Sequence, residues 1–287
     1  MQNHKQIENT IKLTTALKGL AQAYEEISVT KMQRVRGNVL SYRDYLDELS
    51  KVYSKVKQNY NQDITKLIKN KHGGAVTFGT GKNGKAVEIL LSSNSKLHGD
   101  IGRKVFRYFL DHVNKAECDI YIIGKVGKDM YDSSGSKKKY DYTPFPETQQ
   151  AQNGLMTFYE LLERYDSVTV YYGQFINVLI QNPNISKLSG TTNLENNEKV
   201  EKVHFYFEPS LQSVLQFFEN QIFTSLFRQT LHESQLAHDA SRINQMESAL
   251  QNIQDSQYKL TREKRRIKKR VENSKQIQRL LGRRLWR

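Results

Sequence analysis

Apolar residues near the N-terminus recur at alternating three- and four-residue steps. They form two heptad series in residues 5–60: Leu13, Leu17, Leu20, Tyr24 and Ile27, then Val35, Val39, Tyr42, Leu46, Leu49, Tyr53, Val56 and Tyr60. Such steps align side chains along one seam of a helix, as a coiled coil requires. The eleven-residue step between the series locally relaxes a left-handed supercoil. With no proline in this stretch, about fifty residues predict a helical rod of roughly 75 Å.

The C-terminal stretch 211–287 repeats this pattern. Its seam residues are Leu236, Ile243 and Leu250 at one heptad position and Met246, Ile253, Leu260 and Ile267 at the other, and no proline follows Pro209. We predict that residues 13–56 pair with residues 236–267 as an antiparallel coiled coil, with Leu20 near Ile267 and Leu49 near Met246. Two separate amphipathic helices packed on a globular core are the alternative.

The middle of the chain changes to shorter periods. Runs rich in β-branched residues alternate with helical ones, which predicts an α/β sheet. The expected elements are a hairpin joining residues 75–78 and 86–91, strands at 119–125, 167–173 and 203–207, helices at 103–116 and 151–165, and polar loops at 130–144 and 182–199. The predicted domains are therefore an N-terminal coiled-coil helix (1–65), an α/β domain (66–210) and a C-terminal coiled-coil helix with a basic tip (211–287).

Positive charge is concentrated at the C-terminal end. The formal net charge is +14, and residues 257–287 hold thirteen Lys or Arg against Glu263 and Glu272. A basic end suggests an acidic or polyanionic partner. The alternative is a solvated helix that keeps the chain soluble. No window is apolar enough to span a membrane, and the first ten residues lack an apolar signal core. These features, with Cys118 as the single cysteine, fit a reduced cytoplasmic setting.

The sequence does not predict a catalytic, cofactor or metal site. Gly79, Gly84 and Lys85 have the spacing of a phosphate-binding loop, but Ala86 replaces the magnesium-binding Ser or Thr, and a strand-like run follows where a helix is needed. His232 and His238 are six residues apart, on different faces of a helix. Aromatic residues at positions 24, 42, 53 and 60 lie at seam spacing, which favours packing over base stacking.

Several runs, in order along the chain, resemble the gamma subunit of F-type ATP synthases. They are VTKMQR (29–34), DIYIIGKVGKDMY (119–131), YYGQFINVLIQNP (171–183), FYFEPSLQSVL (205–215) and HESQLAHDASRINQMESALQN (232–252). Each run alone is weakly specific, whereas their shared order and spacing over residues 7 to about 253 are specific.

The resemblance implies an antiparallel coiled coil beside a Rossmann-like α/β domain. It implies a non-catalytic central rotor that turns inside a hexamer of alternating alpha and beta subunits, coupling rotation to ion translocation and ATP synthesis or hydrolysis. An epsilon-like subunit and a membrane rotor ring would bind the globular end, at the cytoplasmic face of a membrane. The residues implied to contact the hexamer are Lys31, Met32, Lys268, Lys269, Arg270 and Val271.

Two runs depart from the family pattern. The family's Asp-Arg-Gly-Leu-Cys-Gly-Gly run appears as Asn94 to Asp100, with His98 in place of the cysteine, and the end of the chain is basic where the family has a small apolar tail. A charged tip cannot lie in an apolar sleeve without unpaired buried charge. Two alternatives therefore stay open: the rotor of a derived motor that does other mechanical work, and a basic coiled-coil module that binds nucleic acid.

Overall fold

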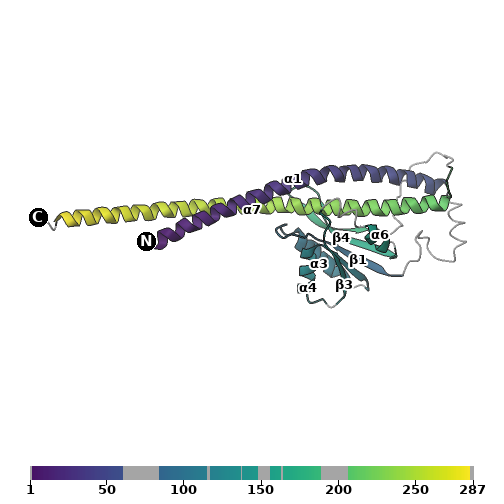
Figure 1. Ribbon diagram of the computed structural model, residues 1–287, viewed down its shortest axis with the longest axis horizontal. Coiled ribbons are helices and arrows are strands. Elements are labelled where there is room, and N and C mark those ends of the chain that lie inside the picture. The colour runs from purple at the N-terminus through teal and green to yellow at the C-terminus, as the bar shows by residue number, and fades with distance from the viewer. Residues whose placement is uncertain are drawn as a thin grey trace. The chain divides into compact units, whose positions relative to one another are not determined.

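The computed structural model describes residues 2–60, 84–114, 117–136, 138–147, 156–162, 164–188 and 206–284. Contacts divide the chain into two compact units: residues 1–30 with 242–287, called here the tip unit, and residues 31–241, called the sheet unit. Two long helices, α1 (Gln2–Asn59) and α7 (Leu211–Arg284), each contribute residues to both units (Figure 1). The predicted domain boundary at residue 210 directly precedes α7, the boundary at residue 65 lies outside the described residues, and both stay predictions.

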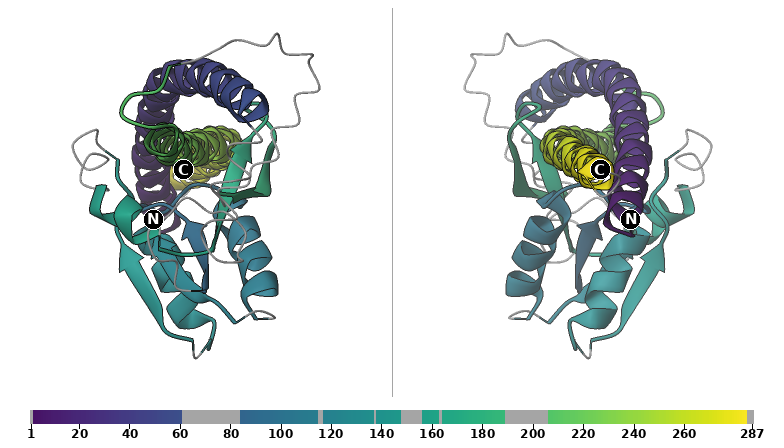
Figure 2. Two further views of the ribbon diagram at one scale, coloured as in Figure 1. Left: turned by 90° about the vertical axis from the view of Figure 1, so that its right-hand side faces the viewer. Right: turned by 90° about the vertical axis from the view of Figure 1, so that its left-hand side faces the viewer.

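Both predicted long helices are confirmed. α1 has 58 residues and α7 has 74, far beyond the length of an average globular helix. Neither contains proline, so no backbone hydrogen bond is lost within them. In the sheet unit, the end-on views show α7 next to the sheet and α1 arching over α7 (Figure 2).

Within the described part of the chain, the sheet has five strands in the order β3-β2-β1-β4-β5. They are β1 (Ala86–Leu91), β2 (Asp119–Ile123), β3 (Tyr140–Thr143), β4 (Ser167–Phe175) and β5 (Gln181–Lys187). The first four are parallel, and β5 joins the edge antiparallel to β4. The chain moves from β1 out to β3 and returns to the other side of β1 at β4, so the winding reverses between β1 and β4. This topology confirms the predicted α/β class.

Helices cover both faces of the sheet. α3 (Ile101–Val113) and α4 (Lys125–Ser133) pack on one face, where the core includes Leu90, Phe109 and Tyr131. α6 (Met156–Leu162) and α7 pack on the other, through residues such as Leu162 and Phe227. The buried positions of α3 (Ile101, Val105, Phe109 and Val113) recur every four residues, as expected for a helix with one inward face.

Three local predictions are wrong. Residues 86–91 form β1, which pairs in parallel with β2 and β4 and not as a hairpin; the other proposed hairpin strand, 75–78, lies outside the described residues. The expected loop 130–144 contains the end of α4 and all of β3, and the expected loop 182–199 contains most of β5. Both strands lie at sheet edges, where polar residues and a proline are tolerated. Residues 206–207 are not in a strand, and the rest of 203–207 is not described.

The two long helices pair antiparallel within each unit. In the sheet unit, the hydroxyl of Tyr53 donates to Glu219 Oε1 over 2.9 Å. In the tip unit, Lys264 Nζ lies 3.3 Å from Glu8 Oε1, and Gln257 Nε2 donates to Thr15 Oγ1 over 3.2 Å. The predicted direction is thus correct, but the register is shifted by about fifteen residues or more. Thr15 lies opposite Gln257, which places residue 252 opposite Leu20, fifteen positions before the predicted partner Ile267.

The seam proposed for residues 13–27 is also wrong. Leu13, Leu17, Leu20 and Ile27 are 60, 45, 57 and 49% exposed. The positions buried in the tip unit are instead Ile7, Ala21 and Ser28, which are also spaced in heptads. Small residues at the seam let two helices approach closely, so the leucines lie outside it. We call Leu13, Leu17, Leu20 and Ile27 the apolar stripe.

Candidate functional site

Polar side chains of α7 are buried against α1 and β4 in the sheet unit. Arg43 Nη2 donates to Glu233 Oε1 over 3.3 Å, and the Glu233 side chain is 7% exposed whereas that of Arg43 is 47% exposed. The preceding residue of α1, Tyr42, stacks on His232, with ring centroids 5.3 Å apart and planes 23° from parallel. These contacts fix the rotational setting of the two helices, because each pair fits only one register.

Burial shifts the titration of this polar group. Burial raises the pKa of Glu233, and the charge and hydrogen bond of Arg43 partly offset that rise. Burial, followed by the charge of Glu233, raises the pKa of Tyr172 to about 12. Burial, followed by the positive charge of Arg228, lowers the pKa of His232, which favours its neutral form. Burial thus disfavours the charged forms of Glu233 and His232 where the two helices pair.

Lys31 is tied to the sheet domain. Its Nζ lies 3.5 Å from Glu147 Oε2, with both side chains 42% exposed. Asn94 Nδ2 donates to Glu147 Oε1 over 3.3 Å and to the carbonyl of Phe145 over 2.8 Å, and it accepts from the Phe145 amide over 2.8 Å. The exposed ion pair contributes at most about 1 kcal/mol. Through Glu147, Lys31 of α1 is linked to Asn94 of the divergent 94–100 run. The sequence analysis missed this contact.

Met32, the neighbour of Lys31, is partly buried. It packs against Val35, Val39 and Leu236, where α1 meets α7. Of the two residues proposed to contact a hexamer from this part of α1, Lys31 is thus the more accessible one. Neither position has been tested as a partner contact, and both stay predictions.

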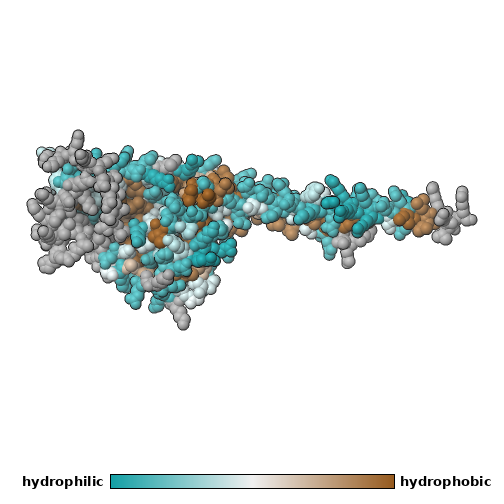
Figure 3. Space-filling model, turned by 180° about the vertical axis from the view of Figure 1, so that it is seen from behind, coloured by the Kyte–Doolittle hydropathy of each residue, from teal (hydrophilic) through white to brown (hydrophobic). Residues whose placement is uncertain are grey.

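The other four proposed contact residues lie in the tip unit. Lys268, Lys269, Arg270 and Val271 are all exposed, and Lys268 Nζ lies 4.0 Å from Glu272 Oε1 of the next turn. Every described side chain from 268 to 281 is exposed. Among them Val271, Ile277, Leu280 and Leu281 are 47–65% exposed, and Figure 3 shows apolar surface near the C-terminal end with polar surface around it. The tip combines basic charge with unpacked apolar side chains.

A further exposed apolar group lies on the β4–β5 hairpin. Ile176, Leu179 and Ile180 are 52, 77 and 49% exposed. Asn177 Oδ1 accepts from the amides of Leu179 and Ile180 over 2.9 and 2.8 Å, which fixes the turn that presents them. The sequence analysis quoted this run only as part of a motif; a cluster of apolar residues at a turn was the available signal.

The place where Rossmann-like sheets bind dinucleotides is filled by protein. Ligands of such sheets lie beyond the carboxyl ends of the strands, where the winding reverses, here between β1 and β4. α7 occupies that position: a Cβ on Gly173 would lie 3.3 Å from the Cβ of Ala237, and a side chain on Gly99, whose φ is +61°, would collide with Ser241. Lys85 directly precedes β1, and its Nζ lies 3.7 Å from Asp119 Oδ2. A strand therefore comes after Lys85, as predicted, where a phosphate-binding loop would be followed by a helix.

Comparison with known proteins assigns this arrangement to a family. A family model described as ATP synthase matches residues 3–271. The chain belongs to the ATP synthase family. Its curated relatives include the ATP synthase gamma chain of Ruthia magnifica, 26% identical over 87% of this chain and 85% of the relative, and that of Staphylococcus aureus strain JH9, 24% identical over 98% of both.

Solved structures share the fold. A central stalk and c-ring structure of the Tetrahymena thermophila mitochondrial ATP synthase matches with a TM-score of 0.55 and 17% identity, over 80% of this chain and 99% of the matched one. A chain of the Euglena gracilis mitochondrial enzyme matches with a TM-score of 0.53 and 13% identity, over 86 and 91%.

The curated relatives are gamma chains, so this chain is of the gamma type, the central-stalk rotor and a non-catalytic subunit of a membrane-associated ATP synthase complex. Within the described residues, no helix contains an apolar stretch long enough to cross a bilayer. The family match ends at residue 271, so residues 272–287 lie outside it.

Proposed function

We propose that the rotor contacts a surrounding hexamer of alternating alpha and beta subunits through two surfaces of its tip unit, the apolar stripe and the basic tip. The observation that carries the proposal is the exposure of four large aliphatic side chains at heptad spacing on α1. A regular row of this kind needs a covering surface, since exposed apolar patches on monomers usually mark an interface.

The residues around the apolar stripe favour a close, sliding contact. Ala16, Gly19 and Ala23 lie beside the stripe, and a Cβ on Gly19 would meet nothing within 4 Å. Between Leu13 and Tyr24 the only charged side chain is Lys18. A rotating contact that changes partners during each turn favours such a surface, because no specific ion pair must be broken at each step.

The basic tip supports a bearing of different chemistry. Residues 268–284 hold seven Lys or Arg against Glu272, and like charges at neighbouring helical positions cost a few tenths of a kcal/mol per pair. An acidic or carbonyl-rich sleeve would supply counter-charge, and Val271 and Ile277 would supply apolar contact. Such a sleeve would differ from the apolar sleeve that the family resemblance implies. This difference supports a derived motor whose hexamer is adapted to a basic tip.

The globular end is proposed to join an epsilon-like subunit and the membrane ring, at the cytoplasmic face. Support for a further partner surface comes from the β4–β5 hairpin, whose exposed aliphatic side chains lie in the sheet unit. Ion transport belongs to the work of the complex as a whole, and the rotor would transmit it mechanically.

The test replaces the stripe while keeping the helix. A variant with Leu13, Leu17 and Leu20 changed to Ser is compared with a control in which three exposed neighbours, Lys12, Gln22 and Glu26, are changed to Ser. Leu, Lys, Gln and Glu have similar helix propensities, so both variants lose the same intrinsic helicity. Each chain is co-expressed with the alpha and beta subunits of its own complex, and the assembled fraction and its ATPase rate are measured.

We expect the stripe variant to assemble at least about tenfold more weakly, and the control to assemble like the wild type. Equal assembly of the two variants would refute a role for the stripe. For the tip, changing Lys264, Arg265, Arg266, Lys268, Lys269 and Arg270 to Gln should weaken assembly most at low salt, where charges act furthest. Equal assembly and ATPase rates at low and physiological salt would exclude a bearing role for the charge.

A further inference from the structure

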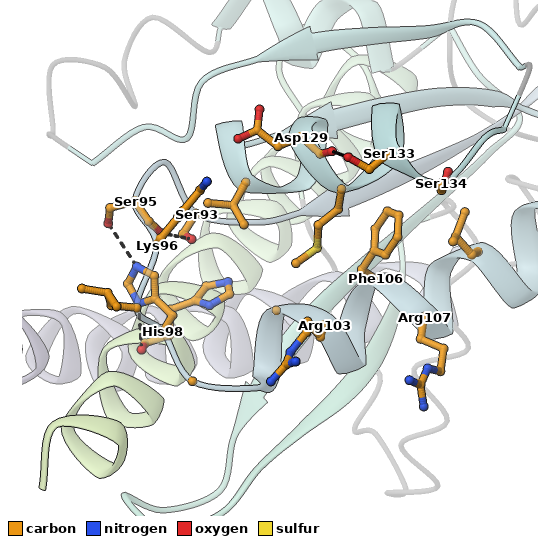
Figure 4. A pocket seen from close by; sticks show the side chains of 17 residues that line it. Ser93, Ser95, Lys96, His98, Arg103, Phe106, Arg107, Asp129, Ser133 and Ser134 are labelled. Carbon is orange, nitrogen blue, oxygen red and sulfur yellow. Dashed lines mark hydrogen bonds between the residues drawn. The ribbon is translucent and has the colours of Figure 1, made fainter. Parts of the chain in front are cut away.

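A groove of about 740 Å³ lies in the sheet unit, at the carboxyl ends of β1 and β2 (Figure 4). It is bordered by the 93–99 loop, α3, α4 and one residue of α7, His238. Its volume falls within the range of about 300–1,000 Å³ that is typical of small-molecule sites. It lies on the α3 and α4 side of the position that α7 fills, and the rotor contacts proposed above do not use it.

The floor of the groove is apolar and comes from facing turns of two helices. Phe106 and Leu110 of α3 lie four residues apart, as do Val126 and Met130 of α4. All four are only partly buried, whereas the opposite face of α3 is packed into the sheet core. Gly102, also in the lining, leaves the α3 end of the groove open, since a Cβ there would meet nothing within 4 Å.

One side of the groove is basic. Arg103 and Arg107 follow each other at one-turn spacing along α3, and Lys96 projects from the loop, whereas Asp129 is the one acidic lining residue. Figure 4 shows both arginines extending outward from α3 beside Phe106. Among the described residues, the ion pair of α3 uses Lys104 and Asp100, 2.8 Å apart, and neither arginine. Two exposed guanidinium groups therefore flank an apolar floor.

The loop that closes the groove is held in a costly conformation. Leu97 has a φ of +73°, the left-handed region, which costs a non-glycine residue about 1 kcal/mol or more. Its neighbour His98 is fixed on both sides: Nδ1–H donates to the carbonyl of His238 over 3.0 Å, which leaves Nε2 to accept from the Ser95 hydroxyl over 3.2 Å. The loop thus holds an apolar side chain, half exposed, at the rim.

We propose that this groove binds an amphipathic organic anion, whose apolar body lies between α3 and α4 and whose single carboxylate, sulfonate or phosphate pairs with Arg103 and Arg107. Guanidinium groups bind such anions with charge-assisted, often bidentate, hydrogen bonds. An apolar floor flanked by cations matches a molecule that carries both features. A small molecule fits better than a polypeptide because the lining is hollowed around a limited volume, with its polar groups on one side.

The experiment uses the full chain and the fluorescent probe anilinonaphthalene sulfonate, an aromatic body with one sulfonate. Binding is titrated by fluorescence, and decanoate or its uncharged counterpart decanol is added as competitor. The charge variant is Arg103→Gln with Arg107→Gln, and its control is Lys125→Gln, an exposed α4 residue outside the lining. The filling variant is Gly102→Leu, and its control is Asp111→Leu on an exposed part of α3. Circular dichroism confirms that each chain is folded.

We expect saturable binding of one probe per chain, displaced by decanoate much better than by decanol. The charge variant should weaken binding at least about tenfold, Gly102→Leu should abolish it, and both controls should stay within about twofold of the wild type. Equal competition by decanol, or binding unchanged in either groove variant, overturns the proposal. Loss of the bound probe when the complex assembles also overturns it, since the groove would then receive a partner chain.

Discussion

Phe227 is a buried side chain of α7 that packs in the core between this helix, α6 and the sheet. It is completely buried, and its ring centroid lies 5.6 Å from those of both Phe158 and Tyr159 of α6. Phe217, ten residues earlier on the same helix, is 63% exposed. Changing each to Ala removes the same atoms from the same helix in opposite environments.

Removing a buried phenylalanine costs about 3–5 kcal/mol. We expect Phe227→Ala to lie in the upper part of that range, because a helix and a sheet that meet across the cavity cannot collapse to fill it. For a chain of 287 residues the urea dependence should be about 3 kcal/mol per molar, the upper end of the ordinary range, so the unfolding midpoint should fall by about 1–2 M. Phe217→Ala should shift it by a few tenths of a molar at most.

The assay is urea unfolding of the full chain, followed by near-ultraviolet circular dichroism, which reports the packing of the aromatic side chains of the sheet unit. Far-ultraviolet circular dichroism on the same samples separates loss of packing from loss of helix. Equal shifts for the two variants, or a loss below about 1 kcal/mol for Phe227→Ala, would refute the view that this contact anchors α7.

Three further outcomes are expected. Burial raises the pKa of Glu233 above its unfolded value, so the folded state should lose stability as pH rises from the ordinary glutamate pKa through the raised one. Thermal unfolding across pH measures this dependence, and Glu233→Gln should flatten it. Cysteines at Thr15 and Gln257, which are in contact, should crosslink with a short bis-maleimide, whereas the register anticipated from the sequence should not. Lys31→Glu replaces the ion pair with Glu147 by a like-charge contact, so it should impair ATP-driven rotation without preventing assembly; normal rotation would show that Lys31 is an ordinary surface residue.

The sequence was sufficient for the elements whose pattern is local. The long helices followed from heptad spacing without proline, and β1, β2 and β4 from buried runs rich in β-branched residues. Edge strands were missed because β3 and β5 are polar and short, and their hydrogen bonds come from a neighbour that no local pattern reveals. β5 even contains Pro183, which an edge position accepts.

The candidate surfaces needed the structure. Heptad spacing assigned the apolar stripe to the seam, whereas the residues that are buried are Ile7, Ala21 and Ser28, a row whose small and polar members gave no apolar signal. The contact of Lys31 with Glu147 joins residues 116 positions apart, which spacing cannot anticipate. The groove combines α3 and α4 with the 93–99 loop, whose departure from the family run was visible in the sequence although its purpose was not.

The filling of the β1–β4 position by α7 has a mechanical consequence. A sheet domain with an empty crevice can open and close around a ligand, and the same freedom lets the domain deform under load. Here Gly99 and Gly173 let α7 approach until Ala237 and Ser241 touch the sheet domain. The crevice is therefore occupied by one of the two long helices. A torque applied to this stretch of α7 is resisted by side chains in direct contact on both sides, with no hinge to absorb the twist. The α/β domain therefore has no ligand crevice at this position and is instead attached rigidly to α7.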